Sequence, residues 1–282
     1  MDDGILVTGA TGRVGAPLVR ELAGDAPVRA ASRNPDSVAE RAGVERVGFD
    51  LEQPETWGPA LDGVNRLFLM FPPSVGVGPV REFVDAARRT GIKHVVCLSV
   101  LGAEKVPVLP HRRIERHIQG RFDYTTLRAA YFMQNLSGIH RPEIVERDEL
   151  FVPAGEGALG LVDARDVAAV AAVTLTEACH RNRAYDVTGP ESLGFREMAR
   201  VFSAELDRDI AYADPGRTAF AWQMYRRGVD PGLIAFMLTE YEVARHGFAG
   251  RTTDDAERVL GREPRSLGAF VADHRDAFAS VR

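Results

Sequence analysis

The chain has 282 residues, of which 45% are hydrophobic and 27% charged, a composition that supports a buried core of ordinary size. Its 35 basic and 40 acidic residues give a net charge of −5 and are mixed along the sequence, which argues against a nucleic-acid or membrane partner and favours small molecules. The apolar runs are far shorter than a bilayer span, and the acidic start Met1-Asp2-Asp3 lacks an apolar leader, so we expect a cytoplasmic protein.

The first strand-like run leads directly into a glycine-rich turn and then a helical pattern, Gly-Ile-Leu-Val-Thr-Gly-Ala-Thr-Gly-Arg-Val-Gly over residues 4–15. In such a turn the first glycine bends the chain, the second lets backbone N–H groups approach a pyrophosphate, and the third lets helix and strand pack closely. The anion then lies at a helix N-terminus. We therefore expect dinucleotide binding, with a purely structural turn as the alternative. The candidate contacts are Gly9, Thr11, Gly12, Arg13, Val14 and Gly15.

Strand-like apolar runs then alternate with amphipathic stretches. They lie at residues 5–7, 28–31, 46–49, 66–70, 94–98 and 124–127. This alternation predicts an α/β fold with a doubly wound parallel Rossmann sheet, covered by helices on both faces and binding ligands at the carboxyl ends of its strands. Beyond about residue 135 the alternation weakens into loops, a helix near 165–177, a strand at 184–187 and later helices.

Several polar and apolar features of the chain have structural interpretations. Cys97 and Cys179 lie in apolar runs and are predicted to be reduced core residues, and the histidines lack metal-site spacing, so no metal is expected. Asp163 and Asp166 precede or begin a helix and are interpreted as N-caps. The apolar stripe at residues 219–245 is predicted to be mostly core, with a substrate-pocket wall as the alternative.

Taken together, the motifs resemble the NmrA-like atypical short-chain dehydrogenases, a group that includes quinone and aromatic-substrate oxidoreductases. The motifs are Thr-Gly-Ala-Thr-Gly-Arg-Val-Gly (8–15), Ser-Arg-Asn-Pro (32–35), Phe-Asp-Leu (49–51), Ser-Val-Leu-Gly-Ala (99–103), His-Arg-Arg-Ile-Glu (111–115), Thr-Thr-Leu-Arg (125–128), Phe-Met-Gln-Asn (132–135) and Val-Thr-Gly-Pro (187–190). The resemblance covers nearly the whole chain. It implies an NAD(P)-binding Rossmann domain over residues 1–135, followed by a region, 136–282, that completes the fold and forms a smaller C-terminal substrate-binding domain.

The residues after the second strand indicate which nucleotide is bound. An NAD site usually places an acid there for the ribose 2′-hydroxyl, whereas a 2′-phosphate needs cations. Here Ser32 and Arg33 follow the strand, the first acid is Asp36, and Arg13 in the glycine turn is a second candidate cation. NADP(H) is therefore favoured and NAD(H) stays possible. In the alternative, Arg33 stacks on adenine or points into solvent.

Other candidate cofactor contacts follow later strands. Asp50 resembles the family position that contacts the adenine amino group, and Leu51 lies beside it. Phe71-Pro72-Pro73 ends the fourth strand, where the ribose and nicotinamide are expected to pass, and Ser99 ends the fifth. These positions predict contact with the cofactor without assigning a chemical role.

The catalytic residues are harder to predict, because the Tyr-x-x-x-Lys pair of ordinary short-chain dehydrogenases is missing. His111 aligns with the Lys and Pro107 with the Tyr. His111 is a candidate proton shuttle, with ribose or substrate binding and a plain helix start as alternatives. Glu115 either orients His111 through an i, i+4 contact or is a solvated charge. Tyr131 is the second catalytic candidate, as a donor to a substrate oxygen or else an ordinary wall residue.

These expectations favour an NADP(H)-dependent oxidoreductase acting on an aromatic, quinone-like or polyketide-type molecule. A quinone fits the missing Tyr/Lys pair, because its reduced oxygens are stable anions or phenols that need less acid–base help. One alternative is a monooxygenase-type enzyme that hydroxylates a phenolic substrate. Another is a non-catalytic NAD(P) redox sensor that regulates a partner protein, and a homo-oligomer is compatible with each of the three.

Overall fold

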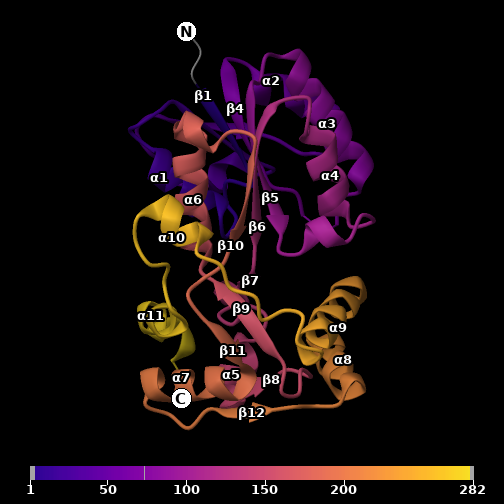
Figure 1. Ribbon diagram of the computed structural model, residues 1–282, viewed down its shortest axis with the longest axis vertical. Helices are drawn as coiled ribbons and strands as arrows, with labels where there is room; N and C mark the ends of the chain where they lie inside the picture. Colours follow the sequence, from indigo (N-terminus) through magenta and orange to yellow (C-terminus); the bar gives the residue numbers. More distant parts are fainter. Residues whose placement is uncertain (1–3, 73, 280–282) are drawn as a thin grey trace. The chain divides into compact units, whose positions relative to one another are not determined.

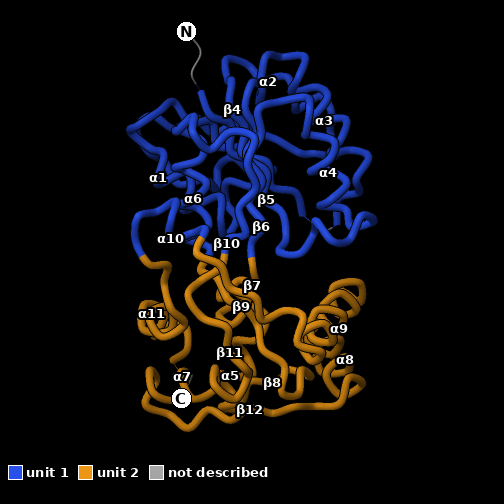
Figure 2. The backbone as a smooth tube through the Cα atoms, in the orientation of Figure 1, with its two compact units in different colours: residues 1–129, 164–187, 255–262 blue, residues 130–163, 188–254, 263–282 orange. Residues whose placement is uncertain are grey.

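A computed structural model describes residues 4–72 and 74–279 of the chain. The expected leaderless start at residues 1–3 and the predicted strand end at Pro73 lie outside the described residues. The chain forms two compact units, which we describe separately (Figure 2). Unit 1 comprises residues 1–129, 164–187 and 255–262, and unit 2 comprises residues 130–163, 188–254 and 263–282. The units are thus interleaved in sequence, unlike the consecutive segments 1–135 and 136–282 that we expected.

Unit 1 is built on a seven-stranded parallel sheet in the order β10-β6-β5-β4-β1-β2-β3 (Figure 1). Its strands are β1 (Gly4–Thr8), β2 (Val28–Ser32), β3 (Val44–Gly48), β4 (Val64–Leu69), β5 (His94–Val100), β6 (Asp123–Ala129) and β10 (Arg183–Val187). Each predicted strand run lies within or overlaps one of them. The strand order reverses direction between β1 and β4, which is where a doubly wound sheet binds its ligand. The predicted α/β Rossmann architecture is confirmed.

Helices cover both faces of this sheet, with α1 and α6 in contact on one face and α3 and α4 in contact on the other (Figure 1). The helices of unit 1 are α1 (Gly15–Leu22), α2 (Trp57–Leu61), α3 (Val77–Arg89), α4 (Pro110–Ile118), α6 (Ala164–Thr176) and α10 (Asp255–Leu260). Helix α3 illustrates why these helices form. Its apolar residues recur at helical spacing, so that one face is buried: Val80, Phe83, Val84 and Ala87.

Unit 2 contains a three-stranded sheet, β11-β9-β7, and a two-stranded sheet, β12-β8. Its strands are β7 (Tyr131–Phe132), β8 (Glu149–Phe151), β9 (Ala158–Val162), β11 (Ser192–Gly194) and β12 (Ala211–Ala213). Its helices are α5 (Arg141–Arg147), α7 (Phe195–Leu206), α8 (Arg217–Arg226), α9 (Pro231–Arg245) and α11 (Leu267–Asp273). They enclose a separate hydrophobic core that includes Phe195, Phe202, Phe220 and Tyr241.

The apolar stripe on α8 and α9 is only partly core. Its residues Phe220, Met224, Ile234, Met237 and Tyr241 are buried. Trp222, Tyr225, Leu233 and Phe236 are instead exposed, so the prediction of a mostly buried stripe was wrong for these positions. The difference arises because a helix buries one stripe of residues, whereas apolar residues here occupy more than one face.

The predictions for cysteines and helix caps had mixed outcomes. Both cysteines are free, and Cys97 is buried as expected, but Cys179 is exposed, so its assignment to the core was wrong. Helix α6 begins directly after Asp163, whose carboxylate accepts from Gln134 Nε2 at 2.8 Å. Asp166, inside the first turn of α6, accepts from Arg262 at 2.8 Å. Among the described helices, none has the length and apolar character needed to cross a bilayer.

Candidate nucleotide-binding site

The glycine turn after β1 has the backbone geometry of a dinucleotide loop. Gly9 has a backbone φ of +65°, which glycine adopts readily because it has no Cβ and which other residues adopt only rarely. A Cβ on Gly15 would lie 2.1 Å from the carbonyl oxygen of Gly9 and 2.7 Å from its carbonyl carbon. Thr8 fixes the end of β1, because its hydroxyl donates to a carbonyl of β4, Phe68 O at 3.0 Å. Helix α1 can therefore start in direct contact with the loop only because position 15 is glycine.

The first turn of α1 is open to an anion. The N–H of Gly12 donates to Gly9 O at 2.8 Å, so this group closes the turn and is not offered to a ligand. Within residues 4–72 and 74–279, no side chain caps helix α1 at Val14. No described backbone carbonyl accepts from the N–H of Val14 or Gly15, and these donors are suited to a pyrophosphate. Thr11 and Arg13, the other predicted loop contacts, are exposed.

The end of β2 combines a fixed serine with an exposed arginine. Ser32 is buried, and its hydroxyl oxygen accepts from the backbone N–H of Asn34 at 3.2 Å. Arg33 is exposed and makes no ion pair with any described residue. The first acid that follows, Asp36, is exposed in a short 3-10 helix (Pro35–Ser37). This arrangement leaves a cation available for a phosphate beside the strand end.

The loop after β3 is held by its own hydrogen bonds. The carboxylate of Asp50 accepts from the backbone N–H of Glu52 at 3.0 Å, and its backbone carbonyl accepts from Trp57 Nε1 at 2.9 Å. Leu51 beside it is buried. Both residues follow the carboxyl end of a strand, as the predicted adenine contact requires.

An aromatic contact joins the end of β4 to the start of α4. Phe71 is buried, and its ring centroid lies 4.8 Å from that of His111, while Pro72 is exposed. Burial lowers the pKa of His111, and the nearby charge of Glu115 opposes that shift. His111 makes no side-chain hydrogen bond to a described residue, so a neutral imidazole is available to a ligand.

Glu115 has a role that neither sequence interpretation predicted. Its carboxylate is buried and accepts from Ser99 Oγ at 2.5 Å, from Arg112 at 2.7 Å and from Arg128 at 3.0 Å. These donors hold the pKa of Glu115 below its usual value, although burial acts most strongly and in the opposite direction. The prediction of a solvated charge was wrong. Ser99 was predicted to contact the cofactor, but its hydroxyl proton is already donated to Glu115.

The register of the sheet explains why Ser99 and Arg128 meet at Glu115. Ser99 in β5 pairs with Arg128 in β6, so both side chains lie near the carboxyl edge to which Glu115 is brought by α4. Sequence separation concealed this arrangement, because strand register is decided by long-range pairing.

Most predicted cofactor contacts share one edge of unit 1. The glycine turn, Ser32 and Arg33, Asp50 and Leu51, Phe71 and Ser99 follow or end β1 to β5 in turn, and the strands are parallel. Their carboxyl ends therefore meet at one edge of the sheet.

Tyr131 belongs to unit 2, where it is part of a buried polar cluster. Its hydroxyl lies 3.2 Å from His140 Nε2 and 3.2 Å from the hydroxyl of Tyr241. Tyr241 Oη and His140 Nε2 are 2.6 Å apart, and both residues are 1% exposed. Burial raises the pKa of Tyr241 well above its ordinary value, which keeps its hydroxyl protonated. Sequence reasoning missed His140 and placed Tyr241 only in an apolar stripe.

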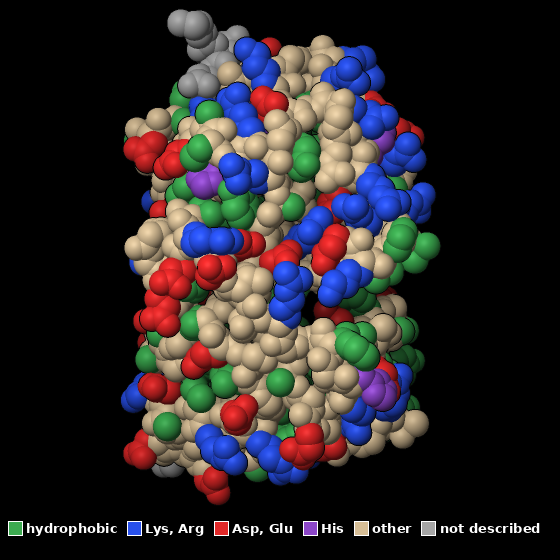
Figure 3. Space-filling view, viewed as in Figure 1, with side chains coloured by type: hydrophobic (Ala, Val, Ile, Leu, Met, Phe, Trp, Pro, Cys, Tyr) green, Lys and Arg blue, Asp and Glu red, His purple; other side chains and the backbone are tan. Residues whose placement is uncertain are grey.

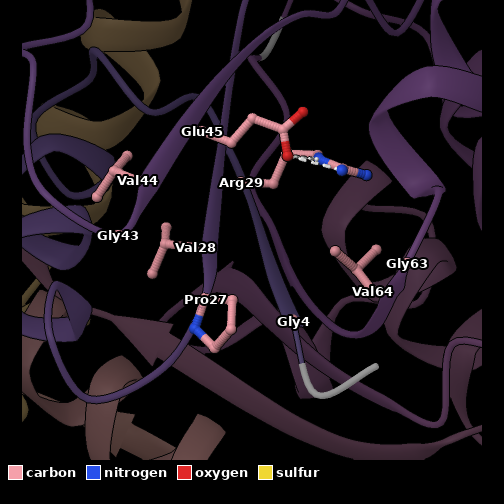
Figure 4. A pocket seen from close by; sticks show the side chains of 9 residues that line it. All are labelled: Gly4, Pro27, Val28, Arg29, Gly43, Val44, Glu45, Gly63 and Val64. Carbon is pink, nitrogen blue, oxygen red and sulfur yellow. Dashed lines mark hydrogen bonds and ion pairs between the residues drawn. The ribbon is translucent and has the colours of Figure 1, made fainter. Parts of the chain in front are cut away.

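A separate hollow of about 320 Å³ lies at the other edge of the sheet (Figure 4). The amino ends of strands line it, among them Val28, Val44 and Val64, and Arg29 pairs there with Glu45 at 2.7 Å. Ligands of doubly wound sheets bind at the opposite, carboxyl ends. The hollow is therefore separate from the candidate nucleotide site.

Comparison with known proteins gives a consistent family assignment. The chain is 32% identical to an NAD(P)H azoreductase of Xenophilus azovorans, over 98% of this chain and 100% of that protein. It is 27% identical to quinone oxidoreductase 2 of Escherichia coli, over 95% of this chain and 97% of that protein. The crystal structure of Citrobacter sp. triphenylmethane reductase complexed with NADP(H) superposes with a TM-score of 0.82 at 25% identity, covering 96% of this chain and 99% of that one. The model of the NmrA-like family matches residues 1–221, and the chain belongs to that family.

Proposed function

We propose that the protein is an NADP(H)-dependent oxidoreductase that reduces aromatic, quinone-like small molecules. The observation that carries the proposal is the contact between Gly15 and Gly9, which sets the open N-terminus of α1 at the carboxyl end of β1. The similar proteins described above are named as an NAD(P)H azoreductase, a quinone oxidoreductase and a triphenylmethane reductase. None of these three names favours the oxygenation alternative.

The preference for NADP(H) rests on the charges after β2. Arg33 is exposed and without an ion pair to a described residue, Ser32 lies beside it, and no acid occupies the position that binds a ribose 2′-hydroxyl in NAD sites. The related triphenylmethane reductase was crystallised with NADP(H), which agrees with this choice. We assign Arg33 to the 2′-phosphate and the N–H groups of Val14 and Gly15 to the pyrophosphate.

The reaction class follows from what His111 and Phe71 offer. When bound, the reduced nucleotide is the hydride source, and the protein has to orient the acceptor and exclude water. A neutral His111 packed on Phe71 offers a flat wall and a hydrogen-bonding group without a full positive charge. A quinone-like acceptor suits such a site, because its reduced oxygens are stable without a strong protein acid. Tyr131 is proposed as a second group that contacts the substrate.

Nucleotide binding tests the first half of the proposal. Arg33→Ala removes charge-assisted hydrogen bonds worth about 1.5–3 kcal/mol, so NADPH should bind roughly 10- to 150-fold more weakly while NADH binding is unchanged. Arg20→Ala is the matched control, since Arg20 is also exposed but lies in the last turn of α1. Calorimetric titration measures all four affinities. Equal losses for NADPH and NADH in Arg33→Ala would disprove the 2′-phosphate assignment.

Turnover with a panel of quinones tests the second half. We expect consumption of NADPH without a requirement for oxygen, and lower kcat in His111→Phe and Tyr131→Phe. If both variants keep full turnover, these residues have no place in the active site. Tight, redox-selective nucleotide binding with no consumption across the panel would instead support the sensor alternative. Figure 3 shows both basic and acidic side chains on the viewed face, with basic ones more frequent at the upper right and acidic ones more frequent at the left.

A further inference from the structure

Three potential metal ligands converge at the turn between α6 and β10. Glu177, Cys179 and His180 offer a carboxylate, a thiol and an imidazole, and their ligand atoms all lie within 4.8 Å of one another. They belong to a short 3-10 helix, Ala178–His180, and the residue before it. Glu177 and Cys179 are exposed, and none of the three residues is among the candidate nucleotide contacts.

Two of the three separations between these ligand atoms are close to those of a tetrahedral zinc site, and the third, between Cys179 and His180, is at most 4.8 Å. Zn–O and Zn–N bonds of about 2.0 Å and a Zn–S bond of about 2.3 Å separate oxygen from nitrogen by about 3.3 Å and oxygen from sulfur by about 3.5 Å. Here Glu177 Oε2 lies 3.6 Å from His180 Nε2 and 3.8 Å from Cys179 Sγ. Shifts of a few tenths of an ångström in these two exposed side chains would bring both pairs to those separations.

The backbone and the histidine ring are held in place by neighbours. Thr125 Oγ1 donates to the carbonyl of His180 at 2.9 Å, and Arg183 Nε donates to the carbonyl of Cys179 at 3.0 Å. His180 Nδ1 lies 2.8 Å from the hydroxyl of Tyr185. When Nδ1 carries the proton and donates to Tyr185, Nε2, which lies 3.6 Å from Glu177 Oε2, keeps a lone pair that can bind a metal.

We propose that Glu177, Cys179 and His180 form a binding site for a borderline-soft divalent cation of the zinc class, with water in the fourth position. The ligand set favours such a cation, because Mg²⁺ and Ca²⁺ prefer oxygen ligands throughout. Binding converts the Cys179 thiol to a metal-bound thiolate and releases its proton to solvent. The bound metal replaces the hydrogen bond that Glu177 accepts from the Cys179 thiol, and it bridges the 3.6 Å separation between Glu177 Oε2 and His180 Nε2.

Cobalt spectroscopy tests the site without depending on enzyme turnover. Chelator-treated protein titrated with Co²⁺ should develop a thiolate-to-metal charge-transfer band and the intense visible bands of tetrahedral cobalt, and Zn²⁺ should abolish both. Cys179→Ser should lose the charge-transfer band, and His180→Gln should weaken binding by more than tenfold. Tyr185→Phe should weaken it roughly tenfold, since partners that orient a ligand typically cost that much.

Two controls separate this site from weak surface binding. His246→Gln removes an exposed histidine that lies 3.1 Å from Glu242 but has no cysteine beside it, and should leave the cobalt spectrum unchanged. Cys97 is buried, and burial raises its thiol pKa, so it should not compete for metal. Absence of the charge-transfer band at excess Co²⁺, or its persistence in Cys179→Ser, would overturn the proposal. Equal affinity in His180→Gln would reduce the site to a lone thiol and would also overturn it.

Discussion

Replacing Gly15 with alanine is the most direct test of the nucleotide loop. The added Cβ would lie 2.1 Å from Gly9 O, whereas an ordinary contact of this kind is about 3.4 Å. Helix α1 and the loop would therefore have to separate by about 1.3 Å. The atoms in the way belong to the backbone of Gly9 and Ala10, so no side-chain rotation relieves the clash.

Gly15→Ala should lower both the stability of the protein and its affinity for NADPH. Overpacking costs about 1–3 kcal/mol, and we expect the upper end because only backbone movement relieves it. About 3 kcal/mol corresponds to a fall in Tm of roughly 6–12 °C for a protein of this size. Moving the N–H groups of Val14 and Gly15 away from the pyrophosphate should also weaken NADPH binding by about 10- to 150-fold, the value of one charge-assisted hydrogen bond.

A matched glycine provides the control. Gly78 lies in the first turn of α3, and a Cβ there meets nothing within 4 Å. Gly78→Ala should leave NADPH affinity unchanged and stabilise the helix by up to about 1 kcal/mol. Thermal unfolding and calorimetric titration of both variants measure the difference. Wild-type Tm and wild-type NADPH affinity in Gly15→Ala would refute the packing argument.

Three further predictions concern buried ionisable groups. Glu115→Gln should lower the free energy of unfolding at pH 7 by about 3 kcal/mol. Folding lowers the pKa of Glu115, so the stabilisation that its carboxylate provides is present above about pH 4.5 and is lost on further acidification. Urea unfolding at pH 7 and below pH 4.5 should therefore show a smaller loss of stability on acidification in the variant than in the wild type. Tyr241→Phe removes a hydroxyl 2.6 Å from His140 and should cost about 1–3 kcal/mol by urea unfolding, whereas Tyr225→Phe at an exposed site should change nothing measurable. Because burial lowers the pKa of His111, the acid limb of kcat/KM for quinone reduction should lie below pH 6.5 and disappear in His111→Phe; a limb above pH 6.5 would contradict a neutral His111.

The glycine turn illustrates where sequence reasoning worked. The glycine turn depends on neighbours within a dozen residues, so its conformation and its place at the start of α1 followed from spacing alone. The choice of NADP(H) over NAD(H) also used adjacent residues, Ser32 and Arg33. Such local patterns carry their own physical reason, which is the conformational freedom of glycine or the charge next to a strand end.

The Glu115 cluster shows where it did not work. Glu115 was interpreted from its own helix, as a partner of His111 or a solvated charge, but its donors come from β5, β6 and the preceding turn of α4. The partners of a buried charge depend on which strands pair and in which register. In the same way, Cys179 lies in an apolar stretch yet is exposed, because it comes in the turn after α6 has ended.

The parallel strands, the crossover helices and the glycine turn could be predicted from the sequence, because each follows from a hydrophobic period or from glycine spacing within a short window. The folded chain was needed to show how the two units interleave in sequence, that Tyr131 contacts His140 and Tyr241, and that the ligand atoms of Glu177, Cys179 and His180 lie close together. The contact of Tyr131 with Tyr241 joins residues far apart in the sequence through long-range packing, and the cluster at residues 177–180 depends on side-chain direction, which residue spacing alone does not give.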